Sequence, residues 1–376
     1  MATLSDDPRS ATNPIFNDNR LKLGVFGHNG PPPSMTNVPE LFKPTWDNSV
    51  RVSQMVDAAG FEAIVPYARW RPFGAANANN GKVFETATWA AATAASTSHS
   101  CVMATLHTSA VHPILAAKQA TTVDHISHGR FAINIVCGWF VPEIEMFGGE
   151  IRPHGDRYAH AHEWIELMKL VWSTEEPVDF EGKHIRAKGA VSLPKPVQTP
   201  FPALMNAGGS PEGQHFAAKH CDIAFVLPQN PSPDAVRAQV ETYRKLAREE
   251  YGRHIQVWCT GYVVQRETEA EANQYVKRYV EEFGDNEAAD MFIKYQLESA
   301  KTIAPEVVNQ IRHALMAGAG GISLVGTADQ ISEKLKLLSD CGLDGILLSW
   351  IDYEEGMRSF TADVLPRLVQ MGLRKR

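Results

Sequence analysis

Short apolar runs alternate with longer stretches whose apolar residues recur at helical spacing, and this alternation constrains the fold more than any other feature. The short runs are apolar throughout instead of alternating in polarity, as strands are when helices cover both faces of a parallel sheet. This α/β pattern favours a (β/α)8 TIM barrel with loop insertions, and a doubly wound open sheet is the alternative. The expected strands are residues 21–27, 61–67, 101–109, 131–138, 203–209, 222–227, 257–264 and 344–350.

One barrel-sized domain accounts for the length of the chain, because α/β barrels with insertions reach 376 residues as single units. The sequence is 44% hydrophobic and 21% charged, which supplies a large core and excludes a disordered chain. We expect an N-terminal extension at 1–20 and a single domain at 21–376, with insertions near 28–45, 180–200 and 267–321.

Charge and cysteine usage exclude several classes of protein. The net charge is -7 and no run of Lys and Arg occurs, which argues against a nucleic-acid-binding protein. The five cysteines are scattered without paired spacing, so neither a disulfide framework nor a metal site is expected. The first twenty residues do not read as a signal peptide, and no apolar stretch of about 20 residues could span a membrane. We expect a cytoplasmic protein that does not bind membranes.

Functional side chains of such barrels lie just after the strands, at their carboxyl ends. The polar and aromatic residues in those places are therefore the candidates for chemistry. They are Tyr67, Ala68, Arg69, Trp70 and Arg71 after the second expected strand, Thr105 and His107 in the third, Asn134, Trp139 and Glu143 in or after the fourth, and Gly208, Gly209 and Ser210 after the fifth.

The sequence AGGSPEG at 207–213 has the most explicit physical meaning among these loops. Two glycines before an expected helix let a ligand approach the backbone, and the N-terminal end of the helix suits a phosphate. The plainer interpretation is that Ser210 only caps the helix and Pro211 begins it. Motifs for P-loop, α/β-hydrolase, zincin and Rossmann proteins do not occur in the sequence.

Several blocks of the sequence resemble the bacterial-luciferase-like flavin monooxygenases. The pattern TxDHxSxGRxxxNxVxGW at 122–139 followed by AGGS at 207–210 carries most of the resemblance. DRY at 156–158, FEGKH at 180–184 and the block from 324 to 350 add to it in the same order. Within this superfamily the chain is similar to the branch that holds the pyrimidine monooxygenase of uracil catabolism and dimethyl-sulfone monooxygenase.

The resemblance implies a flavin-dependent monooxygenase that uses reduced FMN (FMNH2) and O2 to oxygenate a small polar organic compound, of the pyrimidine-like, sulfone or sulfonate class. It implies a two-component system in which NAD(P)H acts indirectly, through a separate NAD(P)H:flavin reductase, and it implies a homo-oligomer. A deazaflavin-dependent oxidoreductase that transfers hydride on the same barrel is the alternative. A barrel that has lost activity is a third interpretation, which the retained candidate residues disfavour.

The resemblance also assigns roles to residues. It places Tyr67, Ala68, Arg69, Asn134 and Glu143 along the flavin ring, and Arg157, Tyr158, Gly208, Gly209 and Ser210 around the ribityl phosphate.

Thr105 and Asn134 then shape the oxygen pocket, where donors stabilise negative charge that develops on oxygen. His107 is the candidate for proton transfer, because the ordinary pKa of histidine lies near neutral pH. Trp139, Trp70 and Arg71 are the candidates for the substrate side. A packed core residue is the less favoured interpretation of Trp139. Arg69 and Arg71 could equally meet the flavin phosphate or a structural carboxylate instead of a substrate.

Overall fold

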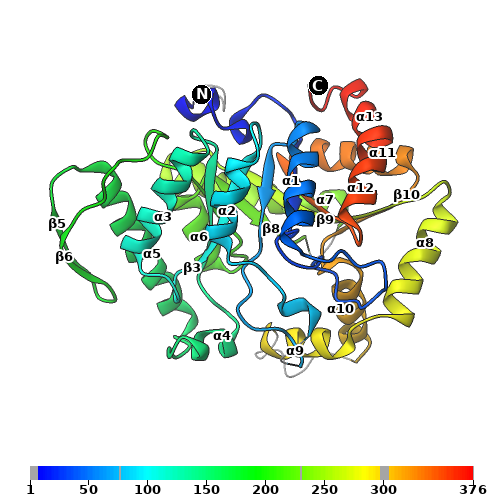
Figure 1. Cartoon of the computed structure of the whole chain (residues 1–376), viewed down its shortest axis with the longest axis horizontal. Helices are drawn as coiled ribbons and strands as arrows, with labels where there is room; N and C mark the ends of the chain where they lie inside the picture. The colour runs from blue at the N-terminus through cyan, green and yellow to red at the C-terminus, as the bar shows by residue number, and fades with distance from the viewer. Residues whose placement is uncertain (1–6, 76–77, 229–230, 297–304, 376) are drawn as a thin grey trace.

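The computed structural model describes residues 7–75, 78–228, 231–296 and 305–375. Its main sheet contains a closed ring of eight parallel strands, surrounded by helices (Figure 1). The ring strands, in ring order, are β1 (Lys22–Phe26), β2 (Ala63–Val65), β3 (Cys101–His107), β4 (Phe131–Val136), β7 (Ala203–Asn206), β8 (Ile223–Val226), β9 (Gln256–Gln265) and β11 (Gly345–Ser349).

Pairing of β8 with β9 and of β11 with β1 closes this ring, so the predicted (β/α)8 barrel is confirmed and the open doubly wound sheet is wrong. Each of the eight predicted strands is present, with ends that differ by a few residues. The helices that follow the ring strands in the chain are α1 (Trp46–Ala58), α2 (Thr86–Ala95), α3 (Pro113–Ile126), α5 (His154–Ser173), α6 (Pro211–His220), α7 (Pro233–Tyr251), α11 (Ala328–Asp340) and α12 (Tyr353–Ser359), the last continued by η6 (Phe360–Val364) and α13 (Leu365–Gln370).

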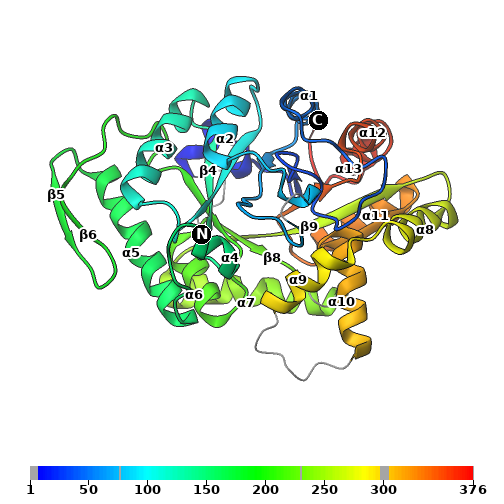
Figure 2. The same ribbon diagram turned by 60° about the horizontal axis from the view of Figure 1, so that its bottom comes forward.

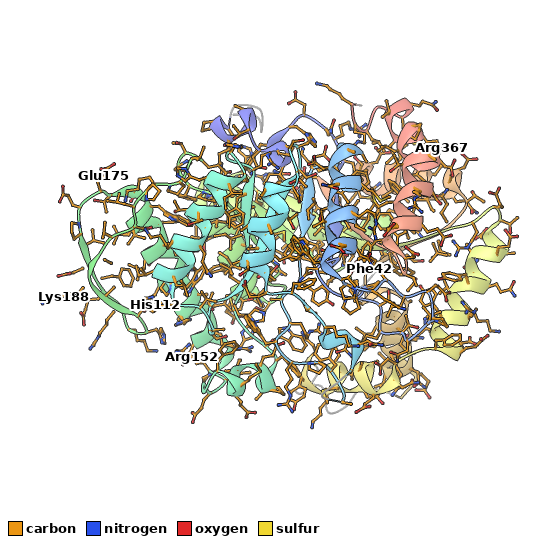
Figure 3. All side chains as sticks on the ribbon, in the orientation of Figure 1. Phe42, His112, Arg152, Glu175, Lys188 and Arg367 are labelled. Carbon is orange, nitrogen blue, oxygen red and sulfur yellow. The ribbon has the colours of Figure 1, made fainter. Side chains whose placement is uncertain are left out.

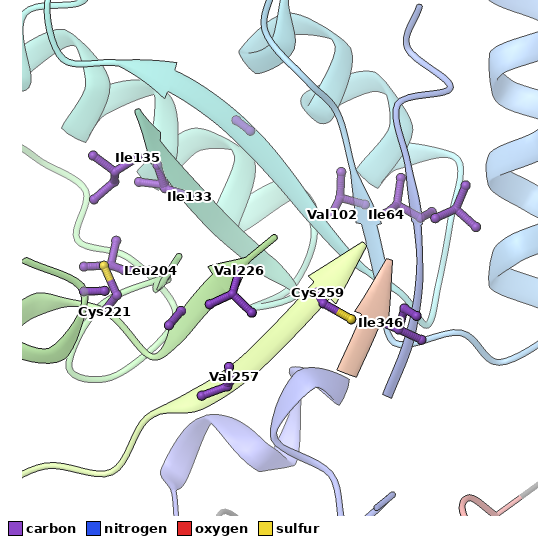
Figure 4. Close-up of a cluster of buried hydrophobic side chains, with 14 of the residues drawn as sticks. Ile64, Val102, Ile133, Ile135, Leu204, Cys221, Val226, Val257, Cys259 and Ile346 are labelled. Atoms are coloured by element: carbon purple, nitrogen blue, oxygen red, sulfur yellow. The ribbon is translucent and has the colours of Figure 1, made fainter. Parts of the chain in front are cut away.

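Side chains alternate between the two faces of each ring strand, because successive residues of a strand point to opposite sides. The outward-facing set packs under the helices and forms the largest apolar cluster; Figure 4 labels ten of its members, among them Ile64, Val102, Ile133 and Val257. Polar groups of the surface, such as Glu175, Lys188 and Arg152, lie outside this core, while Phe42 is buried within it (Figure 3).

The inward-facing residues form a second cluster that fills the barrel, which includes Met103, Met205, Trp258 and Leu347. Ile15 and Phe16 belong to the same cluster. They lie on η3 (Pro14–Phe16), which follows η2 (Pro8–Ala11). The described part of the expected N-terminal extension is therefore packed into the barrel, at the end where both termini lie (Figure 1).

Several elements escaped the sequence analysis. In the expected insertion near 180–200, β5 (Val178–Glu181) and β6 (Arg186–Ala190) form a small antiparallel hairpin outside the barrel (Figure 2). β10 (Ile322–Gly326) pairs with the carboxyl-terminal half of β9, beside the ring. The short elements η4 (Asn79–Gly81) and α4 (Val141–Met146) were also missed. The expected insertion at 267–321 is helical, and its helices are α8 (Glu269–Lys277), η5 (Arg278–Glu282), α9 (Asn286–Gln296) and α10 (Pro305–Gly318).

No helix in the described ranges is both long enough and apolar enough to cross a membrane.

Candidate active site

Thr105 and Asn134 lie side by side inside the carboxyl end of the barrel, because the parallel pairing of β3 and β4 places these two residues directly opposite each other. Asn134 Nδ2 donates a hydrogen bond to Thr105 Oγ1 over 3.2 Å, and Thr105 Oγ1 donates to the Pro66 carbonyl over 2.5 Å. Asn134 Oδ1 is buried and has no hydrogen-bond partner among the described residues. This oxygen is therefore an acceptor that a ligand could satisfy.

Glu143, on the first turn of α4, connects the loops that follow β2 and β4. Its Oε1 accepts hydrogen bonds from the backbone N–H of Trp70 (2.7 Å) and of Arg71 (3.2 Å). Its Oε2 lies 3.8 Å from Nδ1 of His107. Burial raises the pKa of the Glu143 carboxyl, against the opposing effect of the two backbone hydrogen bonds and of Arg69.

His107 occupies the last position of β3, two residues beyond Thr105 and on the same inner face. Burial, followed by the nearby positive charge of Arg69, lowers the pKa of His107 to about 4. The pKa of His107 thus lies below the ordinary value for histidine, and its role in proton transfer remains a prediction. With this lowered pKa the ring is neutral at pH 7, so it has one N–H donor and one acceptor nitrogen.

The loop after β7 meets the start of α5. Ser210 is the N-cap residue of α6, and its Oγ accepts from the Gly213 N–H over 3.1 Å, so Ser210 does cap the helix. A Cβ on Gly208 would lie 2.5 Å from the Tyr158 hydroxyl oxygen and 2.6 Å from Gly213 Cα. Only glycine allows this close approach at position 208.

Gly209 differs, because a Cβ there would meet nothing within 4 Å. Its backbone conformation does not require glycine either, since its φ lies outside the left-handed region. The protein itself gives no reason for glycine at this exposed position, next to the N-terminal end of a ten-residue helix. An open backbone at a helix start is the arrangement that lets a phosphate approach the N–H groups.

Arg157 and Tyr158 lie near the start of α5, which begins at His154. Arg157 Nη1 donates to the Gly138 carbonyl over 2.6 Å, while its buried Nε has no partner among the described residues. Burial raises the pKa of the Tyr158 hydroxyl, which packs against Gly208 and Ser210. The fold thus brings DRY and AGGS together, although they are about fifty residues apart in the chain.

The predicted substrate residues lie around an aromatic cluster. Trp139 packs against Phe73 and Phe292, with ring centroids 5.8 and 5.1 Å apart, and Trp70 packs against Phe147 at 5.1 Å. Trp139 is thus a packed residue that also lines a narrow cleft beside His107. The cleft is lined by His107, Ser109, Ala110, Gly138, Trp139, Phe140, Glu143, Ile144 and Phe147.

The sequence analysis missed Phe292 and Tyr295, because both lie on α9, far along the chain in an expected insertion. Tyr295 packs against Phe140. Tyr67 and Ala68 lie in the loop after β2 as predicted, and the Tyr67 hydroxyl donates to the Pro31 carbonyl over 2.8 Å. The side chain of Arg71 is exposed. Of the other hollows of the described surface, one lined by Asn17, Arg20 and Arg244 among others lies at the opposite end of the barrel. Another, lined by Phe73, Gly74 and Glu287 among others, lies beside the loop after β2.

Comparison with known proteins gives a consistent result. The profile of the family described as luciferase-like monooxygenase matches residues 21–345. The pyrimidine monooxygenase RutA of Acinetobacter baylyi is 28% identical over 354 residues, which cover 92% of this chain and 94% of that protein. An FMNH2-dependent dimethylsulfone monooxygenase of Pseudomonas putida is 28% identical, over 88% of this chain and 90% of that protein. The solved structure of the riboflavin lyase RcaE, with modified FMN and riboflavin, shares the fold with a TM-score of 0.84 at 21% identity, over 94% of this chain and 92% of that one.

Proposed function

Because the chain belongs to the luciferase-like monooxygenase family, we propose that it is the oxygenating component of a two-component system that uses reduced FMN and O2. The family, the barrel and the class of flavin-dependent monooxygenase that the sequence predicted are confirmed. The proposed substrate is a small polar organic compound with a pyrimidine-like ring, a sulfone or a sulfonate group. NAD(P)H acts only through a separate flavin reductase, and a homo-oligomer remains an expectation.

The residues present fit FMN. The phosphate would be held at the start of α6 by Ser210 and the open backbone of Gly209, with Tyr158 beside them. The polar edge of the flavin ring would satisfy the unpaired Asn134 Oδ1. The support for this assignment is that unpaired polar atoms and a helix start lie at one end of one barrel, where ligands of such barrels bind.

Bound reduced FMN supplies the electrons with which O2 is activated. The chain orients the ligand and lines the pocket where charge develops on oxygen. Asn134 and Thr105 hold their polar groups in a fixed chain of hydrogen bonds that ends at the Pro66 carbonyl. Such a chain is preorganised and needs little rearrangement during reaction. The aromatic residues around Trp139 exclude water from the cleft, which protects an oxygen-activating site from side reactions.

The contact of Tyr158 with the loop of Gly208 and Ser210 is the observation that carries this proposal. Two motifs that the resemblance assigned to one phosphate are distant in sequence and adjacent in space. The two motifs also meet beside Gly209, a glycine that neither packing nor backbone conformation requires. A purely structural contact between the motifs would not explain this glycine.

Anaerobic titration with photoreduced FMN, followed by rapid mixing with O2 in a stopped-flow spectrometer, tests the function. We expect tight binding and a flavin spectrum that reoxidises differently from free FMN. Ser210→Ala should weaken FMN binding. The matched control Thr268→Ala removes the N-cap of α8, which lies on the other side of the barrel, and should leave binding unchanged (Figure 1).

No binding of reduced FMN would contradict the proposal. The deazaflavin alternative would then be tested by the same titration with a reduced deazaflavin. Equal losses in Ser210→Ala and Thr268→Ala would show that Ser210 is only a helix cap.

A further inference from the structure

Arg69, in the loop after β2, is a half-buried arginine held by aromatic rings. Its guanidinium carbon lies 3.8 Å from the centroid of the Phe73 ring and 5.4 Å from that of Tyr67. Stacking of this kind fixes the plane of the guanidinium while leaving its N–H groups, which lie in that plane, available for hydrogen bonds.

The N–H groups of Arg69 have no acceptor among the described residues, and no carboxylate there forms an ion pair with it. Glu143 is the acidic residue that interacts with it electrostatically, but one oxygen of Glu143 is occupied by the backbone N–H groups of the same loop. None of the Arg69 nitrogens is among the fully buried atoms without a partner. These nitrogens therefore keep some accessible surface, although the side chain as a whole is half-buried.

The three arginines that are buried in the described part of the chain all have partners, whereas the half-buried Arg69 has none. Arg9 forms an ion pair with Asp222 at 2.8 Å, and Arg374 forms one with Glu62 at 3.0 Å. Arg130 donates to backbone carbonyls, one of them at 2.7 Å. A positive charge taken partly out of water is unfavourable unless a partner compensates it. At Arg69 the missing partner points to a bound anion.

We propose that Arg69 binds an anionic oxygen group of the organic substrate. This deepens the proposed function and rests on it. Of the substrate classes named above, the inference selects sulfonates, together with carboxylates, over neutral sulfones and pyrimidine rings. The planar fork of a guanidinium donates two parallel hydrogen bonds to such a group.

The FMN phosphate is a second source of negative charge, but the order of the strands around the barrel separates the proposed phosphate site from Arg69. Arg69 follows β2, whereas the loop of Gly208 and Ser210 follows β7, and strands β3 and β4 lie between these two. Arg69 is instead next to His107, whose pKa its charge lowers, and to the cleft that His107 and Glu143 line. The flavin ring, along which the resemblance placed Arg69, is the remaining competitor, and the experiment separates the two roles.

Calorimetric titration with matched pairs of ligands tests the proposal. Methanesulfonate and dimethyl sulfone have similar shapes and differ in charge, as do benzenesulfonate and methyl phenyl sulfone. The protein, saturated with oxidised FMN, should bind the sulfonate of a pair about 10- to 100-fold more tightly than the sulfone, as charge-assisted hydrogen bonds provide. Arg69→Met should reduce this ratio to about twofold or less, while Arg69→Lys should retain an intermediate preference because it keeps the charge without the fork.

Two further measurements separate the possible roles. Arg237→Met removes an exposed charge on α7 and should leave the ratio unchanged. NMR titration of the His107 ring should show its pKa rising in Arg69→Met, because the positive charge that lowers it is gone. The affinity for oxidised and for photoreduced FMN should stay within about threefold in Arg69→Met, since a residue that serves only the substrate leaves cofactor binding nearly intact.

Equal affinity of the wild-type protein for both members of each pair, or binding of neither, would overturn the proposal. A large loss of affinity for reduced FMN in Arg69→Met, with the sulfonate preference intact, would assign Arg69 to the flavin and would also overturn it. Failure of the wild-type protein to bind FMN at all is a different result, which contradicts the proposed function.

Discussion

At the scale of single residues, the site depends on what each polar atom faces. Glu143 was expected along the flavin ring, a role that remains a prediction. In the structure one of its oxygens holds the backbone of Trp70 and Arg71, and the other faces His107. Glu143 therefore positions the loop that carries Arg69, whatever it contacts in the complex with a ligand.

Glu143→Ala should free this loop. Removing the shared acceptor leaves two backbone N–H groups without a partner, which costs about 1–3 kcal/mol of stability when the groups stay buried. Urea unfolding should show that loss, and hydrogen exchange at the amides of Trp70 and Arg71 should become faster. Glu143→Gln keeps an acceptor oxygen and should restore most of the protection. An unchanged exchange rate in Glu143→Ala would show that the loop keeps its conformation without Glu143.

At the scale of elements, the junction of β7 and α6 explains two adjacent glycines by different causes. Gly208 is required by the contact with Tyr158, and Gly209 has free space around it. In the sequence AGGS, Gly208 and Gly209 cannot be told apart. Only the packing of α5 against the start of α6 distinguishes their roles.

The paired variants Gly208→Ala and Gly209→Ala should separate stability from binding. Gly208→Ala forces atoms apart in a packed junction, which costs about 1–3 kcal/mol. Gly209→Ala adds a methyl group in open space and should change stability by less than about 0.5 kcal/mol. Its affinity for FMN should nevertheless fall, because the methyl group occupies the approach to the backbone. Thermal unfolding and FMN titration check both variants, and intact binding in Gly209→Ala would contradict the phosphate site.

At the scale of the whole molecule, the N-terminal segment fills the barrel from the end opposite the candidate site. Phe16 is 1% exposed and packs with the inward-facing side chains of the ring strands. The arginine Arg9 anchors the same segment through its ion pair with Asp222, next to β8. The barrel is closed at this end by residues that precede its first strand.

Phe16→Ala should therefore lower the free energy of unfolding by about 3–5 kcal/mol, as large-to-small changes in a packed core do. Leu337→Ala is the control, because Leu337 on α11 is 43% exposed, and it should cost less than about 0.5 kcal/mol. Denaturant unfolding measures both. Similar small losses in the two variants would show that the segment only lies against the barrel.

Buried neutral histidines make the molecule sensitive to acid. Burial lowers the pKa of His28 from 6.5 to about 3 and, with Arg69, that of His107 to about 4. Below pH 6.5 the unfolded chain binds protons at these residues and the folded chain does not, so stability falls as the pH decreases from 6.5 towards these values. The loss between about pH 7 and pH 5 is about 2 kcal/mol for each such histidine.

His28→Gln should make the pH dependence shallower by about that amount, which denaturant unfolding at the two pH values measures. His28 Nε2 hydrogen-bonds Ser53 Oγ at 2.8 Å, and glutamine retains a group that can do so. An unchanged difference between the two pH values would mean that His28 takes up a proton in the folded protein.

Much of the fold was predictable from the sequence because it depends on local patterns. Apolar runs of strand length gave the ring strands, since a strand covered by helices must be apolar on its outer face and filled on its inner one. β5 and β6 were missed because only alternate residues of β5 are half-buried, and β10 because it pairs with the extended end of a strand already counted. Neither the β5–β6 hairpin nor the edge strand β10 is apolar throughout, as the ring strands are.

The sequence by itself determined which residues could serve the site. Asn134, Thr105, DRY and AGGS follow from motifs, and their roles with FMN remain predictions. Only the tertiary structure decided which of these residues meet: the register of β3 against β4 pairs Thr105 with Asn134, and the packing of α5 on α6 sets Tyr158 against Gly208. It also decided that Arg69 stacks on Phe73 without a carboxylate partner and that His107 is neutral. The charge state and the pKa of a side chain depend on neighbours that folding brings from distant parts of the chain, so they cannot be read from the residue type alone.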